Sequence, residues 1–217
     1  MANSQPDGYF AFPSSGGGRP VLVLHAWWGL NDTVRDVCDR LAASGYLAFA
    51  PDLYHGQVTN TTAAAEKLSA NLFKDLESAR TEVSWASQFL SQHHKQTGSG
   101  MAVIGFSLGA FFALDLSVYK PDLVRSVVIF YGTRPGGYRS AQAAYLGHFA
   151  EMDEFEPQQE IDSLEEALIS AGLPVTFHQY KGTGHWFFEP DHPGAFNSGA
   201  ANLAWERTLT FLKETLA

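Results

Sequence analysis

The sequence GFSLG at residues 105–109 has the Gly-x-Ser-x-Gly form that suits nucleophilic catalysis by Ser107. The run Met101–Gly105 is short and apolar, as in a buried strand, and Leu108–Tyr119 has the pattern of a helix. At a sharp turn from strand to helix, a serine hydroxyl projects above the sheet, and flanking glycines leave room for the turn. The helix start also offers the Leu108 N–H to a developing oxyanion. We therefore predict that Ser107 is a nucleophile; the alternative is a glycine-rich turn in which the serine caps the helix.

A serine nucleophile needs a base, and the base needs a group that orients it. Asp153 follows the apolar run Tyr145–Ala150, and His185 follows the run Val175–Tyr180 in a glycine-rich segment that we expect to be a loop. The chain order Ser107, Asp153, His185 is that of α/β-hydrolases. We predict that His185 is the base and Asp153 the orienting acid. The alternatives are that Asp153 is one charge on a solvated acidic loop and that His185 is structural.

The elements that would position these residues alternate between strands and helices, which predicts an α/β protein with a mostly parallel sheet of about seven strands. The expected strands are Tyr9–Phe12, Val21–His25, Tyr46–Ala50, Met101–Gly105, Val124–Phe130, Tyr145–Ala150 and Val175–Tyr180. Expected helices are one capped by Asn31 or Asp32 and ended by Gly45, then Phe73–His93, Leu108–Tyr119, Ile161–Ser170 and Asn202–Leu216.

Length and composition restrict the functions that need to be considered. The 217 residues suit one domain over residues 1–217, and 45% hydrophobic against 17% charged residues is typical of a folded globule. Fourteen Lys plus Arg against 23 Asp plus Glu give a net charge of -9, which argues against nucleic-acid binding. No apolar run is long enough to span a membrane and no signal peptide is readable, so we expect a cytoplasmic protein. No His, Cys or carboxylate spacing resembles a zinc site, and we expect no metal or cofactor.

Several stretches in the right order resemble the dienelactone hydrolase family of the α/β-hydrolase superfamily. They are VLVLHAWWGLND (21–32), YLAFAPDLYHG (46–56), VIGFSLGA (103–110), FYG (130–132), GHFAEMDEF (147–155) and YKGTGHWFF (180–188). The resemblance implies an α/β-hydrolase fold without a separate lid domain. It places the family's nucleophile, a cysteine there, at Ser107, and its acid and base at Asp153 and His185. It also implies the backbone N–H groups of Trp27 and Leu108 as oxyanion donors.

Two positions depart from that family pattern. The dienelactone hydrolases carry a glutamate that helps to activate the thiol, and Ala26 stands at that position here. A serine deprotonated by histidine has no need of it, and the one cysteine, Cys38, lies on the apolar face of a predicted helix. The arginine that grips a substrate carboxylate shortly after the histidine is also absent, because the residues after His185 are Trp, Phe, Phe and Glu. An anionic dienelactone is therefore a less natural substrate for this chain.

Ligands bind beyond the carboxyl ends of the strands in such sheets, and the loops expected there are rich in aromatic residues. We predict a pocket for small neutral esters or lactones, lined by Trp27, Trp28, Tyr54, Tyr131, Trp186 and Phe187. The alternative is that Trp28 and Phe187 pack as core. Arg134 and Arg139 are candidates for binding a substrate carboxylate or are solvated loop charges, and His25 is either a polar pocket residue or a hydrogen-bonded strand end.

Together these patterns predict a serine-dependent hydrolase of small carboxylic esters that forms an acyl-enzyme. One alternative is a lactone hydrolase of the dienelactone type, a carboxymethylenebutenolidase. Another, of a different class, is a catalytically weak ligand-binding protein on the hydrolase fold. The expected partner is a small-molecule ester or lactone, with neither nucleic acid nor membrane, and the expected state is a monomer or weak homodimer.

Overall fold

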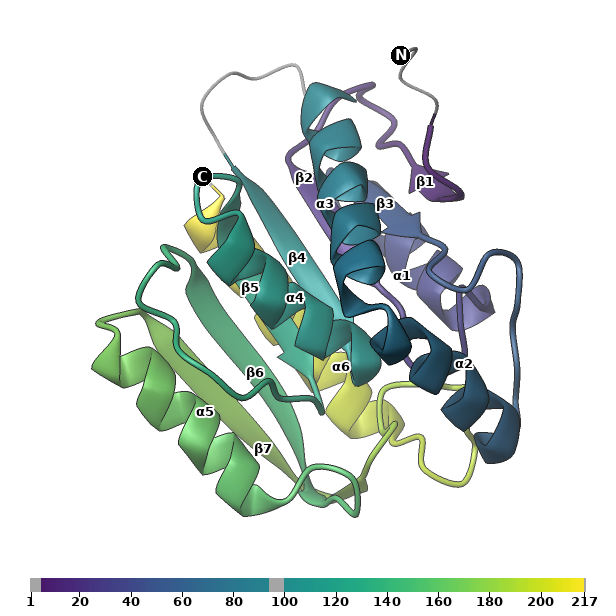
Figure 1. Cartoon of the computed structure of the whole chain (residues 1–217), viewed down its shortest axis with the longest axis vertical. Helices are drawn as coiled ribbons and strands as arrows, with labels where there is room; N and C mark the ends of the chain where they lie inside the picture. The colour runs from purple at the N-terminus through teal and green to yellow at the C-terminus, as the bar shows by residue number, and fades with distance from the viewer. Residues whose placement is uncertain (1–4, 94–99, 217) are drawn as a thin grey trace.

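A single seven-stranded sheet runs through the computed structural model, which describes residues 5–93 and 100–216 (Figure 1). The strand order is β1-β3-β2-β4-β5-β6-β7, with β1 antiparallel to β3 and the other pairs parallel. The strands are β1 (Gly8–Ala11), β2 (Pro20–Leu24), β3 (Leu47–Pro51), β4 (Met101–Phe106), β5 (Val124–Phe130), β6 (Ala144–Met152) and β7 (Val175–Gly184).

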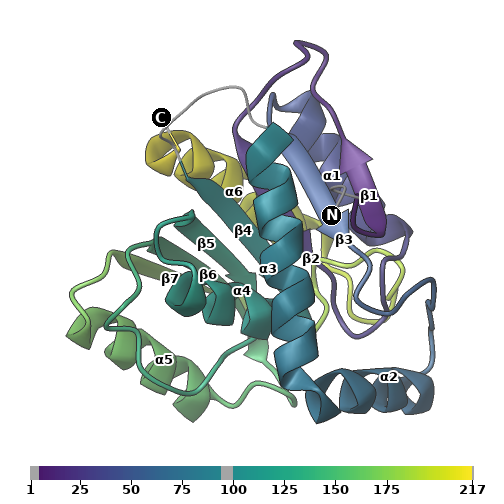
Figure 2. The ribbon, with the colours of Figure 1, turned by 45° about the horizontal axis from the view of Figure 1, so that its top comes forward.

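Helices cover both faces of this sheet, as Figure 2 shows from a second direction. They are α1 (Asp32–Ala43), α2 (Thr62–Lys74), α3 (Leu76–His93), α4 (Leu108–Tyr119), α5 (Gln158–Ser170) and α6 (Ser198–Thr215). Helices α1 and α6 pack on one face, and α3, α4 and α5 on the other. None of the described helices is long and apolar enough to cross a membrane.

Side chains along β2 alternate between the two faces of the sheet, so this one strand packs against both layers of helices. Val21 and Val23 belong to the core under α1 and α6, whereas Leu22 and Leu24 belong to the core under α3 and α4. All residues of β2, β3 and β4 are buried. Burial on both faces is why these strands read as continuous apolar runs and pair in parallel.

The predicted α/β class, with about seven mostly parallel strands and helices on both faces, is confirmed. Helix α1 begins as expected, since the Asn31 side chain accepts a hydrogen bond from the Val34 N–H at 3.1 Å. Among the described residues, no inserted domain interrupts the sheet. The order of strands reverses direction between β2 and β4, and in such sheets the carboxyl ends of the strands at this point are where ligands bind.

Two expectations about local structure are wrong. The predicted helix Phe73–His93 is in fact the end of α2 followed by α3, because Asp75 interrupts the pattern and its carboxylate accepts a hydrogen bond from the Ser78 N–H at 3.1 Å. The rest of α2 was missed because it buries only Ala65 and Ser69 and so has a weak apolar stripe. The glycine-rich segment before His185 is also no loop, since β7 continues to Gly184.

The first turn of α4 lies directly against the backbone of two strands. A Cβ placed on Gly109 would stand 2.1 Å from the Leu24 carbonyl oxygen, and one on Gly105 would stand 2.3 Å from the Gly109 carbonyl oxygen. Both contacts are with backbone, which cannot move aside as a side chain can. The two glycines of the Gly-x-Ser-x-Gly sequence are therefore required by helix-to-strand contact.

We expect Gly109→Ala to lower the free energy of unfolding by at least about 2 kcal/mol, because the added methyl group overlaps the β2 backbone. Urea unfolding followed by circular dichroism measures the effect. Gly137→Ala is the matched control, since no atom lies within 4 Å of a Cβ built there. Equal midpoints for the two variants would contradict the packing argument.

Candidate active site

Ser107 occupies the turn between β4 and α4 with a backbone conformation that is unusual for a residue with a side chain. Its φ is 49° and its ψ is -111°. The turn is held by hydrogen bonds from the Ser107 N–H to the Phe130 carbonyl at 2.9 Å and from the Ala110 N–H to the Ser107 carbonyl at 2.8 Å. Gly132 leaves room beside it, because a Cβ there would lie 2.6 Å from the Ser107 carbonyl oxygen. Strain of this kind persists only where the surroundings impose it.

His185 connects Ser107 to Asp153. Its Nε2 lies 3.0 Å from Ser107 Oγ, and its Nδ1 lies 2.8 and 2.9 Å from the two Asp153 carboxylate oxygens. An Nδ1–H donated to the carboxylate leaves Nε2 free to accept the serine proton. The His185 and Asp153 side chains are only 4% and 3% exposed, so this pair is largely shielded from water.

Asp153 is itself held by the loop that follows β6. Its Oδ1 accepts hydrogen bonds from the Phe155 N–H at 2.9 Å and the Glu156 N–H at 3.0 Å. Of the acidic residues around it, Glu151 and Glu154 are exposed, and Glu156 accepts a hydrogen bond from the Thr133 hydroxyl. Burial raises the pKa of Glu156 to about 7. Asp153 is therefore the carboxylate of this segment that contacts the histidine.

The predicted oxyanion donors lie at the ends of neighbouring parallel strands. Trp27 follows β2 and Leu108 begins α4, and neither N–H donates to another backbone group among the described residues.

His25, one of the pocket candidates, directly follows β2 and is fully buried. Its Nδ1 bonds the Ala26 carbonyl at 2.8 Å and its Nε2 accepts the Leu53 N–H at 3.3 Å. His25 is thus the hydrogen-bonded strand end and not a residue open to substrate, and burial lowers its pKa.

Three aromatic side chains that reach the surface lie together near His185, and we call them the aromatic rim: Trp27, Phe155 and Trp186. Phe155 and Trp186 pack against the His185 ring, and Trp27 packs against Phe155. The Phe155 ring lies 5.0 Å from the rings of both His185 and Trp186 and 5.8 Å from that of Trp27. Phe155 is 45% exposed. It was missed in the sequence, although its place two residues after Asp153 was a usable signal. The rim presents apolar surface next to His185, whose Nε2 lies 3.0 Å from Ser107 Oγ.

The other aromatic candidates are buried and offer little surface to a substrate at Ser107. Trp28, Tyr54, Tyr131 and Phe187 are 3% exposed or less. They are buried because they fill the space under the loops, as Trp28 does between Trp186 and His192, with ring centroids 5.3 and 4.3 Å away. For Trp28 and Phe187 the alternative of core packing therefore holds.

Neither arginine candidate is arranged to grip a substrate. Arg134 donates from Nε to Asp115 at 2.7 Å, and Asp115 also accepts from Arg80 Nε at 2.8 Å. This ion-pair group is largely buried and joins α3 and α4 to the segment after β5. Arg134 is therefore anchored to Asp115 through Nε, and Arg139 is exposed on the loop.

Tyr131 supports His185 from the side away from solvent. It follows β5 with a φ of 37°, its ring lies 4.9 Å from the His185 ring, and its hydroxyl donates to Glu189 Oε1 at 2.7 Å. Burial raises the pKa of Glu189 to about 8. At neutral pH this carboxyl group therefore carries a proton, and Tyr131 and Glu189 form a neutral pair beneath the histidine.

Glu189 also belongs to the one group of three possible metal-ligating side chains that the described ranges contain, with Asp191 and His192. The two Asp191 carboxylate oxygens already accept hydrogen bonds from the Asn31 amide and the Thr33 hydroxyl, both at 2.7 Å. With Glu189 bonded to Tyr131, both carboxyl groups have protein partners. These bonds tie the segment after β7 to the start of α1, which lies beside it in Figure 2.

The cysteine at position 38 is not exposed. Cys38 is fully buried, and burial raises the pKa of its thiol.

The raised pKa of Glu189 gives a testable dependence of stability on pH. Because the folded protein holds this proton more tightly than the unfolded chain, its stabilisation is complete below a pH of about 4.5 and is lost as the pH rises to about 8. The slope from one such group is at most about 1.4 kcal/mol per pH unit. Glu189→Gln removes the ionisable group and keeps an acceptor for Tyr131. We expect its free energy of unfolding to fall less steeply than that of wild type across this range.

Urea unfolding at several pH values measures these slopes. The exposed Glu154→Gln variant is the control and should keep the wild-type slope. Glu156, whose pKa is also raised by burial, contributes to all three proteins alike. Parallel curves for wild type and Glu189→Gln would mean that Glu189 ionises in the folded protein as easily as in the unfolded chain.

Comparison with known proteins places this chain in a family. The profile of the dienelactone hydrolase family matches residues 7–216. A protein of Aquifex pyrophilus named usf is 31% identical over 96% of this chain and 93% of its own length. A protein of Aquifex aeolicus (strain VF5), named "putative carboxymethylenebutenolidase", is 29% identical over the same shares.

Solved structures share the fold at lower sequence identity. A dienelactone hydrolase-like promiscuous phosphotriesterase from metagenomic libraries has a TM-score of 0.88 and 20% identity, covering 97% of this chain and 92% of its own. A dienelactone hydrolase candidate from Klebsiella pneumoniae has a TM-score of 0.81 and 22% identity, covering 94% and 90%. These likenesses show the α/β-hydrolase fold, and the profile match over almost the whole length shows that the chain belongs to the dienelactone hydrolase family.

Proposed function

We propose that this protein is a serine-dependent hydrolase of small carboxylic esters that works through an acyl-enzyme. The observation that carries the proposal is the hydrogen-bonded chain from Ser107 Oγ through His185 to the Asp153 carboxylate, with the serine on a strained strand-to-helix turn. This is the geometry that nucleophile, base and orienting acid require.

In the proposed reaction, Ser107 Oγ attacks the ester carbonyl carbon while His185 Nε2 takes the hydroxyl proton. The negative charge on the former carbonyl oxygen is stabilised by the Trp27 and Leu108 N–H groups. The carbon–oxygen bond to the alcohol then breaks, and His185 returns the proton to the leaving oxygen. Water repeats the sequence on the acyl-serine with His185 again as base, which releases the carboxylic acid and the free serine.

The surroundings of the site favour a small neutral substrate. The aromatic rim offers apolar contact, and Glu151 and Glu154 are exposed on the segment that carries Asp153. The net charge of -9 adds to the repulsion of anions. Arg134, which would have offset this repulsion, is paired with Asp115.

A lactone hydrolase is the second candidate, and the family match together with the name of the Aquifex aeolicus relative favours it. The chemistry at Ser107 would be the same, because a lactone is a cyclic ester. A ligand-binding protein without turnover is the candidate of another class. The connected Ser107, His185 and Asp153 side chains argue against it, since binding alone has no need of them.

We expect Ser107→Ala to reduce hydrolysis of p-nitrophenyl acetate at least about a thousandfold, because the nucleophile is lost. Ser15→Ala, in an exposed loop, should retain the wild-type rate. A fluorophosphonate probe should label wild type at Ser107, and iodoacetamide should leave activity unchanged because the Cys38 thiol is buried. Equal rates for wild type and Ser107→Ala would disprove the mechanism, and failure of the probe to label Ser107 would favour the binding protein.

A pair of matched esters tests the preference for neutral substrates. Valerate and monoglutarate p-nitrophenyl esters have acyl chains of equal length that end in a methyl group and a carboxylate, respectively. We expect kcat/KM at least about tenfold higher for the valerate ester, with the gap narrowing at high salt as charge repulsion is screened. A faster reaction of the glutarate ester would instead support an anionic substrate such as a dienelactone.

A further inference from the structure

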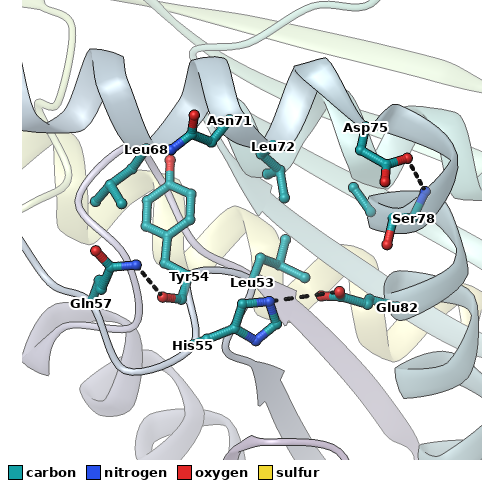
Figure 3. Close-up of a pocket in the computed structure, with 11 residues that line it drawn as sticks. Leu53, Tyr54, His55, Gln57, Leu68, Asn71, Leu72, Asp75, Ser78 and Glu82 are labelled. Carbon is teal, nitrogen blue, oxygen red and sulfur yellow. Dashed lines mark hydrogen bonds and ion pairs between the residues drawn. The ribbon is translucent and has the colours of Figure 1, made fainter.

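A cavity lies where the loop after β3 meets α2 and α3, and its lining includes none of Ser107, Asp153, His185 or Trp27 (Figure 3). Its volume is about 190 Å³. At about 30 Å³ per water molecule in the liquid, this is room for a compound of roughly six non-hydrogen atoms. The cavity is therefore large enough for a small metabolite and too small for a peptide.

One wall of the cavity carries a buried hydroxyl group without a partner. Tyr54 is 3% exposed, and its hydroxyl has no hydrogen bond in the structure. Figure 3 shows the ring pointing toward Asn71 of α2. A buried polar group left unpaired costs about 1–3 kcal/mol. A ligand that reached this hydroxyl would supply the missing hydrogen-bond partner.

The charges in the lining favour a cation. Asp75 and Glu82 contribute two carboxylates, and the basic side chain beside them is His55, which lies 3.7 Å from Glu82 and is 64% exposed. The Leu68 and Leu72 side chains add an apolar wall. A matching compound therefore has an ammonium group, a short apolar chain and a hydroxyl.

The loop after β3, which lines this cavity, packs tightly against the segment after β2 that carries Trp27. We call that segment the oxyanion loop. The Thr59 N–H donates to the Trp28 carbonyl at 3.0 Å, and the Tyr54 ring lies 4.8 Å from that of His25. A Cβ on Gly29 would stand 2.4 Å from the Gln57 carbonyl oxygen. The two loops thus have no room to move independently.

The α2 wall reaches the second oxyanion donor through α4. Phe73 packs against Phe111 and Phe112, with ring centroids 5.2 and 5.9 Å apart. Leu108, whose N–H is that donor, lies one turn earlier on α4. The two walls of the cavity are therefore in contact with the two elements that carry the proposed oxyanion donors.

We propose that this cavity binds a small amino alcohol as an effector, with the ammonium on Asp75 and Glu82 and the hydroxyl on Tyr54. Occupancy restrains the loop after β3 and, through it, the oxyanion loop. This raises kcat for ester hydrolysis with little change in KM. The coupling to catalysis rests on the proposed function, whereas the binding does not.

Binding is tested on the whole protein by calorimetry and amide NMR shifts with 4-aminobutan-1-ol, compared with 4-hydroxybutyrate as the anion of similar size. We expect the amino alcohol to bind at least tenfold more tightly and to shift residues of the loop after β3. Glu82→Gln should weaken it at least fivefold, while Glu66→Gln, exposed on α2 outside the cavity, should not. Equal affinity for the anion, or no effect of Glu82→Gln, would overturn the site.

Coupling is tested by the rate of carboxylic acid release from p-nitrophenyl acetate with and without saturating amino alcohol, after subtraction of the uncatalysed reaction. An increase in kcat for wild type and Glu66→Gln that is lost in Glu82→Gln supports the effector role. The same increase in Glu82→Gln would mean that the amino alcohol acts outside this cavity, and purely competitive inhibition would make the cavity part of the substrate site; either result overturns the effector role. If wild type has no esterase activity, the proposed function fails while the binding result still stands.

Discussion

The contact between the first turn of α4 and the backbone of β2 and β4 is the constraint on which the rest of the site depends. Only glycine at positions 105 and 109 lets the helix approach closely enough. This approach forces Ser107 into its strained conformation and lifts its hydroxyl above the sheet. It also brings the Leu108 N–H beside the loop after β2, which carries the Trp27 N–H.

The segments at the carboxyl ends of β5, β6 and β7 carry His185 and two of the groups in contact with it. Tyr131, Asp153 and His185 come from three successive strands, so their positions depend on one sheet and not on a mobile loop. Tyr131 and Trp186, on either side of this arrangement, also have positive φ values. Residues in such conformations are kept where packing and hydrogen bonds outweigh their cost, and here the packing centres on the His185 ring.

Electrostatics in this part of the protein depend on protonated acids as well as charged ones. Burial keeps a proton on Glu189 at neutral pH, while Asp153 receives two backbone N–H groups and the imidazole. The Asp153 carboxylate, which contacts His185, and the Glu189 carboxyl group, which contacts Tyr131, therefore have different environments. The proposed effector cavity uses a third kind of environment, in which the Asp75 and Glu82 carboxylates face space that a cation can enter.

Much of this protein followed from local sequence pattern. Apolar runs and helical periods predicted the sheet and its helices, because these depend on residues near one another in the chain. The GFSLG sequence predicted Ser107, and the places of Asp153 and His185 after apolar runs predicted its two partners. The exposure of an aromatic side chain does not depend on such local order. Trp27 and Phe155 reach the surface while Trp28 and Phe187 are buried, and Arg134 forms an ion pair with Asp115. These outcomes were decided by tertiary structure, since each rests on contacts between segments far apart in the sequence.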